Sequence, residues 1–144
     1  MECTVRWGGP SGMTSGMTFV AETGSGHLVA MDGATDGGGR NLAARPMELL
    51  LAGTGGCTAY DVVLILKRGR HDVRGCDVTL KAKRAETDPK VFTHIQMRFI
   101  VRGRGLKHDV VERAVRLSHE KYCSASVMLE KTAQMTIEVE IVED

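Results

Sequence analysis

The sequence predicts an α+β fold, a mixed or antiparallel sheet with helices on one side, on three observations. Short apolar runs rich in β-type residues lie near the N-terminus. A long apolar helical segment follows from Pro46. Alternating segments, an amphipathic stretch and a last alternating run complete the chain. The resulting order, β-β-β-α-β-β-α-β, is typical of α+β domains.

The N-terminal region reads as a small meander of strands. Residues 3–7 alternate as a strand does, and residues 17–21 and 27–31 are two more short apolar runs. Thr23-Gly24-Ser25-Gly26 lies between the last two and is a hairpin signal.

The segment from Pro46 to about Arg70 predicts a long helix. Proline is favoured in the first turn, where its missing N–H costs nothing. Glu48 lies in the same turn, where a carboxylate suits the positive end of the helix dipole. Apolar residues occur on nearly all faces, which predicts a buried central helix.

The second half predicts a long β-hairpin and an amphipathic helix. Residues 77–84 and 92–101 alternate, and Thr87-Asp88-Pro89-Lys90 between them reads as a turn. Further along we expect an amphipathic helix over 107–122, a short turn over 127–130 and a last strand over 136–142.

Composition limits the classes of function. A chain of 144 residues predicts one domain over 1–144. A net charge of +1 and an aromatic content of 4% argue against nucleic acid as a partner. The N-terminus lacks a signal-peptide pattern, and the apolar runs are short of membrane-spanning length. We therefore expect a cytoplasmic protein with reduced cysteines and no membrane partner.

Cys57 follows three closely spaced glycines, Gly53, Gly55 and Gly56. Each costs about 1 kcal/mol relative to alanine inside a helix, so three within one turn need a reason. One reason is a close helix crossing, such as a subunit interface, and another is access of a ligand to the backbone beside Cys57. The alternative is a buried structural thiol beside a packing notch.

Cys123 ends the second helical pattern. A helix C-terminus raises the pKa of a thiol, which fits a resolving cysteine better than an attacking one. The alternative is a small core residue. Cys57 and Cys123 are 123 − 57 = 66 residues apart, and the spacing leaves open whether they meet.

Glu48 precedes Cys57 by 57 − 48 = 9 residues, about 13 Å of rise and half a turn on a continuous helix. Its carboxylate would then not reach the thiol of its own chain. Either the glycines break the helix, or the partner comes from a second subunit, or Glu48 only complements the helix dipole.

The other potential ligands show no pattern. Cys3 and Cys76 have no partner spacing and are interpreted as structural. The chain has no C-x-x-C, and His71, His94 and His119 are scattered, so we predict neither a metal site nor a cofactor.

Two segments resemble the OsmC/Ohr family of thiol-dependent peroxidases. Pro46-Met47-Glu48-Leu49 through Gly55-Gly56-Cys57 is similar to the family's first cysteine helix, and Lys121-Tyr122-Cys123-Ser124 falls at its second cysteine. The element order matches over essentially the whole chain. The amino-acid sequence of these segments resembles a less studied OsmC-like branch more than the central peroxidases.

The resemblance implies an OsmC-like fold and an intertwined homodimer with two sites at the subunit interface. It implies that Cys57 is peroxidatic and Cys123 resolving, that organic hydroperoxides are reduced, and that a dithiol such as dihydrolipoamide restores the thiols. Glu48 would pair with an arginine beside the peroxidatic thiol.

That arginine is missing from its family position. The corresponding turn reads Gly8-Gly9-Pro10, and Arg40 and Arg45 are the cations in the loop before the helix. We favour Arg40. If neither reaches Cys57, activity is low or aimed at another substrate. The alternative function is a non-enzymatic module that binds a ligand or a thiol carrier; a redox sensor ranks last, because no DNA-binding element is visible.

Overall fold

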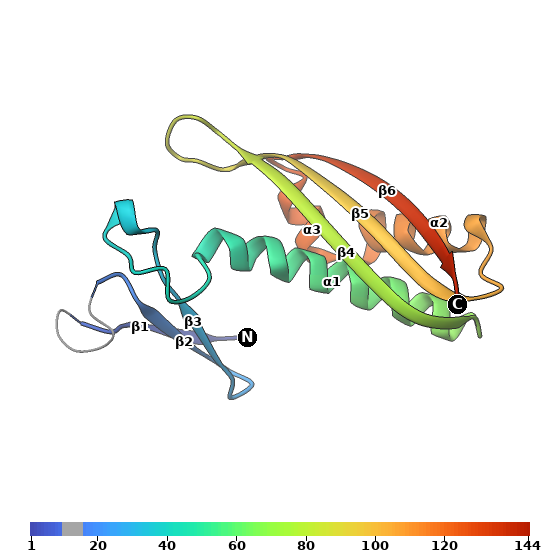
Figure 1. Ribbon diagram of the computed structural model, residues 1–144, viewed down its shortest axis with the longest axis horizontal. Coiled ribbons are helices and arrows are strands. Elements are labelled where there is room, and N and C mark those ends of the chain that lie inside the picture. The colour runs from blue at the N-terminus through green and yellow to red at the C-terminus, as the bar shows by residue number, and fades with distance from the viewer. Residues whose placement is uncertain (10–15) are drawn as a thin grey trace. The chain divides into compact units, whose positions relative to one another are not determined.

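The computed structural model describes residues 1–9 and 16–144 (Figure 1). It divides into two compact units, Met1–Leu50 and Leu51–Asp144. Each unit is described by itself, and the expectation of a single domain over 1–144 stays a prediction.

The first unit is an antiparallel meander, as predicted. Its strands are β1 (Cys3–Trp7), β2 (Phe19–Thr23) and β3 (Leu28–Met31), paired in the order β1-β2-β3. The β2–β3 turn contains Gly26, whose φ of +84° favours glycine. A short 3₁₀ turn, η1 (Thr35–Gly37), follows. The turn that lacks the family's arginine reads Gly8-Gly9-Pro10, and its Pro10 lies outside the described residues.

Helix α1 (Pro46–Arg68) begins at the predicted proline. The Glu48 carboxylate reaches back one turn and accepts the backbone N–H of Arg45 at 3.0 Å. This is one half of a capping box, and it satisfies an N–H that the first turn leaves free. Within one chain, burial is confined to one stripe, while Leu50 and Tyr60 are exposed. The stripe consists of Thr54, Gly55, Thr58, Val62 and Leu66.

By length and composition, α1 meets the criterion for a membrane-crossing helix. It has 23 residues and a mean hydropathy of 1.7 over its most apolar window. This differs from the expectation that its apolar runs are too short, because the helix continues through the glycines and Asp61. Core helices of globular proteins meet the same criterion.

The second unit contains a mixed three-stranded sheet of β4 (Asp72–Arg84), β5 (Phe92–Arg104) and β6 (Gln134–Glu143), in the order β4-β5-β6. The predicted hairpin is confirmed, because β4 and β5 pair antiparallel. Strand β6 pairs parallel to β5, and the helices between them supply the crossover that a parallel pair needs. Strand β4 starts five residues before the predicted start, since a register shift between Val73 and Gly75 interrupts the alternation.

The core of this unit lies on one face of its sheet, where helices α2 (His108–Leu117) and α3 (Ser124–Leu129) cover it (Figure 1). Strand β5 alternates buried and accessible positions, because successive side chains point to the covered face and to the opposite face in turn. Its buried large side chains are Phe92, Ile95, Met97, Phe99 and Val101.

Helix α2 does not run to residue 122 as the amphipathic pattern predicts. It gives way at Ser118 to a π-helical turn, η2 (Ser118–Tyr122), in which the Cys123 N–H donates to the Ser118 carbonyl oxygen at 2.8 Å. Bonding five residues back widens the turn and changes the direction of the following side chains. Helix α3 then begins immediately after Cys123.

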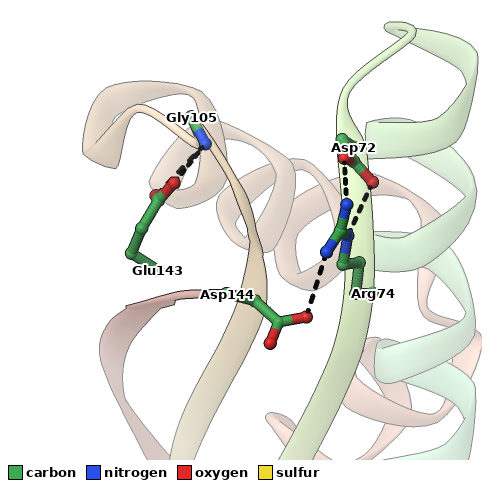
Figure 2. Close-up of polar contacts among 5 residues, drawn as sticks. All are labelled: Asp72, Arg74, Gly105, Glu143 and Asp144. Atoms are coloured by element: carbon green, nitrogen blue, oxygen red, sulfur yellow. Dashed lines mark hydrogen bonds and ion pairs between the residues drawn. The ribbon is translucent and has the colours of Figure 1, made fainter.

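Polar contacts join the strands at the end of the sheet where β4 begins and β5 and β6 end (Figure 2). Arg74 donates twice to the Asp72 carboxylate, at 3.1 and 2.9 Å, and its guanidinium lies 3.6 Å from Asp144. The backbone N–H of Gly105 donates to both oxygens of Glu143 at 3.1 Å. The Arg74 contact links the C-terminal residue to the start of β4 across the sheet, and the Gly105 contact links the end of β6 to the loop after β5.

Candidate active site

Two cysteines and one carboxylate meet in the second unit. Cys57 and Asp61 lie one turn apart on α1, and Cys123 lies between η2 and α3. The two Sγ atoms and an Asp61 carboxylate oxygen all lie within 4.8 Å of one another. Cys123 is buried, while Cys57 and Asp61 are half-buried. The structure therefore brings the two predicted cysteines together.

Cys123 is both the C-cap of the η2 turn and the N-cap of α3, so it ends one helical segment, as predicted, and begins another. Its Sγ accepts hydrogen bonds from the Ser126 backbone N–H at 3.4 Å and from Ser126 Oγ at 3.2 Å. The π turn ends the preceding helix before Cys123, so the thiol faces the positive end of a new helix. Cys123 thus lies at a helical C-terminus and a helical N-terminus at once, and its resolving role stays a prediction.

A buried hydroxyl pair joins the helix of Cys57 to the turn before Cys123. Thr58 Oγ1 and Ser118 Oγ are 2.9 Å apart and both side chains are fully buried. Ser118 Oγ also lies 3.2 Å from Asp61 Oδ2. When Thr58 donates to Ser118, Ser118 can donate to the carboxylate, which orients Asp61 toward the two thiols.

The environment of Cys57 disfavours its thiolate. Burial raises the pKa of the Cys57 thiol above the ordinary 9.0, and the neighbouring Cys123 and Asp61 raise it further. A hydrogen bond from the Ala125 backbone N–H opposes this effect. Among the described residues, no cation is a cause of the shift. Within this chain, the surroundings of Cys57 therefore favour the thiol over the thiolate.

Of the three glycines before Cys57, Gly55 is the one at which an added Cβ would meet a described side chain. A Cβ added at Gly55 would lie 2.6 Å from Leu80 Cδ1, so β4 packs closely against α1 there. A Cβ at Gly53 or Gly56 would meet nothing within 4 Å. Close helix–strand packing explains Gly55, and the reasons considered for Gly53 and Gly56 stay open.

Glu48 forms an ion pair with Arg45 in the first unit. Arg45 Nη1 lies 3.1 Å from Glu48 Oε1. The Arg45 backbone N–H, followed by its guanidinium, lowers the pKa of the Glu48 carboxyl despite some burial. The backbone N–H of Arg40 donates to Asp32 Oδ2 at 3.2 Å. The structure thus pairs Glu48 with Arg45, whereas the sequence favoured Arg40, whose role stays a prediction.

Sequence reasoning missed Asp61 and Ser118. Asp61 follows Cys57 by four residues on a helix, a spacing that places both on one face and could have identified it. Ser118 had no such signal, because only the π turn brings it to Thr58. Cys3 is exposed, and Cys76 is half-buried with a pKa raised by burial and by Asp77. His119 lies 2.7 Å from Glu130 through Nε2.

Comparisons with known proteins identify the family. The model of the family described as OsmC-like protein matches residues 37–138. "Protein YhfA" of Escherichia coli strain K12 is 47% identical over 142 residues, covering 99% of this chain and 98% of YhfA.

Solved structures share the fold. A hypothetical protein from Aquifex aeolicus VF5 is 29% identical with a TM-score of 0.83, covering 99% of this chain and 96% of that one. A Legionella pneumophila protein described as an organic hydroperoxide resistance protein, OsmC, is 17% identical with a TM-score of 0.65, covering 90% and 99%. These matches bear out the OsmC-like α+β fold.

Proposed function

Because this chain belongs to the OsmC-like family, we propose that it is a thiol-dependent peroxidase that reduces organic hydroperoxides through Cys57 and Cys123. Some of its structural neighbours are named organic hydroperoxide resistance proteins. The observation that carries the proposal is the proximity of the two sulfur atoms, within 4.8 Å of each other. A disulfide needs a sulfur separation of about 2 Å, so a local adjustment suffices to form one.

In the proposed reaction, the Cys57 thiol loses its proton and the thiolate attacks the O–O bond. The bond breaks, the leaving alkoxide takes up a proton and departs as an alcohol, and a sulfenic acid remains on Cys57. The Cys123 thiol then attacks that sulfur, water leaves, and a Cys57–Cys123 disulfide forms. A dithiol reductant such as dihydrolipoamide restores both thiols by exchange. The hydrogen bonds from Ser126 stabilise negative charge on the Cys123 sulfur during its attack.

We further propose that the protein acts as a cytoplasmic homodimer. Helix α1 is continuous through its glycines, so the nine residues from Glu48 to Cys57 span about 13 Å. In the dimer, the Glu48–Arg45 pair lies beside Cys57 of the second copy. There the Arg45 guanidinium lowers the pKa of the thiol and stabilises negative charge on the peroxide. The exposed apolar side chains of α1, Leu50 and Tyr60, support such an association.

The test is a disulfide map. The reduced protein is treated with one equivalent of an organic hydroperoxide and analysed by non-reducing peptide mass spectrometry. We expect a rapid Cys57–Cys123 disulfide, absent in Cys57→Ser, and a trapped sulfenic acid on Cys57 in Cys123→Ser. Cys76→Ser is the matched control, because this half-buried thiol lies outside the pair. Multiple turnover retained in Cys57→Ser would overturn the proposal.

A second candidate is a non-enzymatic module that binds an apolar ligand or a thiol carrier. The raised pKa of Cys57 favours it, since a protonated thiol is a poor nucleophile. Under this alternative, the folded protein keeps unmodified thiols after peroxide treatment and binds a ligand saturably. The disulfide map therefore separates the two candidates.

A further inference from the structure

We propose that Cys57, Cys123 and Asp61 form a binding site for a thiophilic divalent cation, Zn²⁺. The sequence predicted no metal site, because it has no C-x-x-C and its histidines show no ligand spacing. The fold brings two thiols and one carboxylate together, with all three ligand atoms within 4.8 Å. Metal binding is independent of the proposed peroxidase activity and is tested without peroxide.

The geometry suits a tetrahedral ion. Zinc binds thiolate sulfur at about 2.3 Å and carboxylate oxygen at about 2.0–2.2 Å, so its ligand atoms lie roughly 3.5–3.8 Å apart. The observed limit of 4.8 Å requires closure by at most about 1.0–1.3 Å. Three protein ligands leave the fourth position for water or another small ligand. Two soft sulfurs beside one carboxylate favour Zn²⁺ over Mg²⁺ or Ca²⁺, which take oxygen ligands.

The surroundings hold the ligands in place. Ser126 donates to Cys123 Sγ through its backbone N–H and its hydroxyl. Ser118 Oγ lies 3.2 Å from Asp61 Oδ2, and Thr58 fixes Ser118 in turn. Such outer contacts orient metal ligands and set their affinity.

Electrostatics also favours a cation. With both thiols ionised, the cluster would carry three negative charges at close range. A divalent ion relieves this repulsion. Binding replaces the two thiol protons by Zn²⁺ and releases about two protons per metal, so affinity rises with pH.

The experiment titrates the reduced protein with Co²⁺ under anaerobic conditions and then displaces Co²⁺ with Zn²⁺. We expect one ion per chain and a thiolate-to-cobalt charge-transfer band that Cys57→Ser and Cys123→Ser each abolish. Asp61→Asn should weaken Zn²⁺ binding at least about tenfold, the lower end for loss of an outer contact alone. Cys76→Ser and Asp109→Asn are matched controls that should leave binding unchanged.

A readout on the unmodified protein covers the case in which a variant fails to fold. One equivalent of Zn²⁺ should slow alkylation of Cys57 much more than that of the exposed Cys3, measured by peptide mass spectrometry. An unchanged alkylation rate at Cys57, the absence of a cobalt band in excess metal, or a band that persists in a folded Cys57→Ser protein would overturn the proposal.

Discussion

The two units of the chain differ in how they bury their side chains. In Leu51–Asp144, one face of the sheet is covered, and Met97, Phe99 and Val101 are fully buried. In Met1–Leu50, all five residues of β1 are exposed, and Trp7 retains 52% of its accessible surface. The described buried side chains of that unit are Thr18, Ala21 and Asp32.

The two units thus illustrate two ways of stabilising a three-stranded sheet. The second unit is stabilised by apolar burial, whereas the first relies on hydrogen bonds. Asp32 accepts three backbone N–H groups, from Gly33, Arg40 and Leu42, and so ties down the loop before α1. Apolar residues are left exposed in this three-stranded sheet, and the proposed dimer would supply a further surface to cover them.

The largest expected effect comes from the core of the second unit. Phe99→Ala should lower the free energy of unfolding by about 3–5 kcal/mol, because it leaves a cavity at a fully buried position. Trp7→Ala in the first unit should cost only about 1 kcal/mol in an isolated chain, chiefly its 2.7 Å hydrogen bond to the Gly16 carbonyl. Urea unfolding at several protein concentrations measures both.

A loss for Trp7→Ala as large as that for Phe99→Ala would break this comparison for the single chain. If the loss also depends on protein concentration, a second copy covers Trp7.

In a single chain, without the cation of a second copy, the reactivity of Cys57 should rise steeply with pH. Burial, Cys123 and Asp61 raise its pKa above 9.0, so the thiolate fraction increases about tenfold per pH unit through neutral pH and keeps rising beyond 9.0. Alkylation rates at Cys57, followed by peptide mass spectrometry, check this against glutathione as a reference thiol. A plateau below pH 9.0 would show that a cation reaches the thiol.

A smaller effect distinguishes the glycines of α1. Gly55→Ala should destabilise by about 1–3 kcal/mol, because the added Cβ meets Leu80. Gly56→Ala has open space in the single chain and should stabilise by about 0.5–1 kcal/mol. Thermal unfolding of the two variants compares them directly. Destabilisation by Gly56→Ala would indicate that a second helix crosses there.

The smallest expected effect lies in the first unit and depends on acid. The N–H of Leu42, aided by those of Gly33 and Arg40, lowers the pKa of the Asp32 carboxyl below 3.8. Its stabilisation is therefore present above that value and is lost as the pH falls through the lowered pKa. Asp32→Asn should lower the melting temperature at neutral pH, with a deficit that shrinks in acid. A deficit independent of pH would contradict this.

Local signals were sufficient for most of the fold. Pro46 with Glu48 marked the start of α1, and Asp88-Pro89 marked the turn between β4 and β5, because caps and turns depend on neighbouring residues. The parallel pairing of β6 with β5 had no local signal, since it joins residues about 40 positions apart, such as His94 and Gln134.

For the same reason, only part of the candidate site could be predicted from the sequence. The sequence suggested Cys57 and Cys123, and their proximity depends on tertiary packing. Asp61 lies four residues after Cys57 on α1, and this helical spacing places both side chains on one face. The N-cap position of Cys123 was missed because helical periodicity does not distinguish a continuous helix from one interrupted by a π turn.

The π turn also makes the site sensitive to how the chain winds before Cys123. Cys123 reaches its position because η2 accommodates one residue more than an α-helical turn does. If the same residues wound in α-helical form, the extra residue would rotate the thiol by about 100° around the helix axis. The sulfur pairing would then be lost, while Ser118 and the apolar face of α2 would stay in place. The winding of a single turn thus decides whether the two thiols meet.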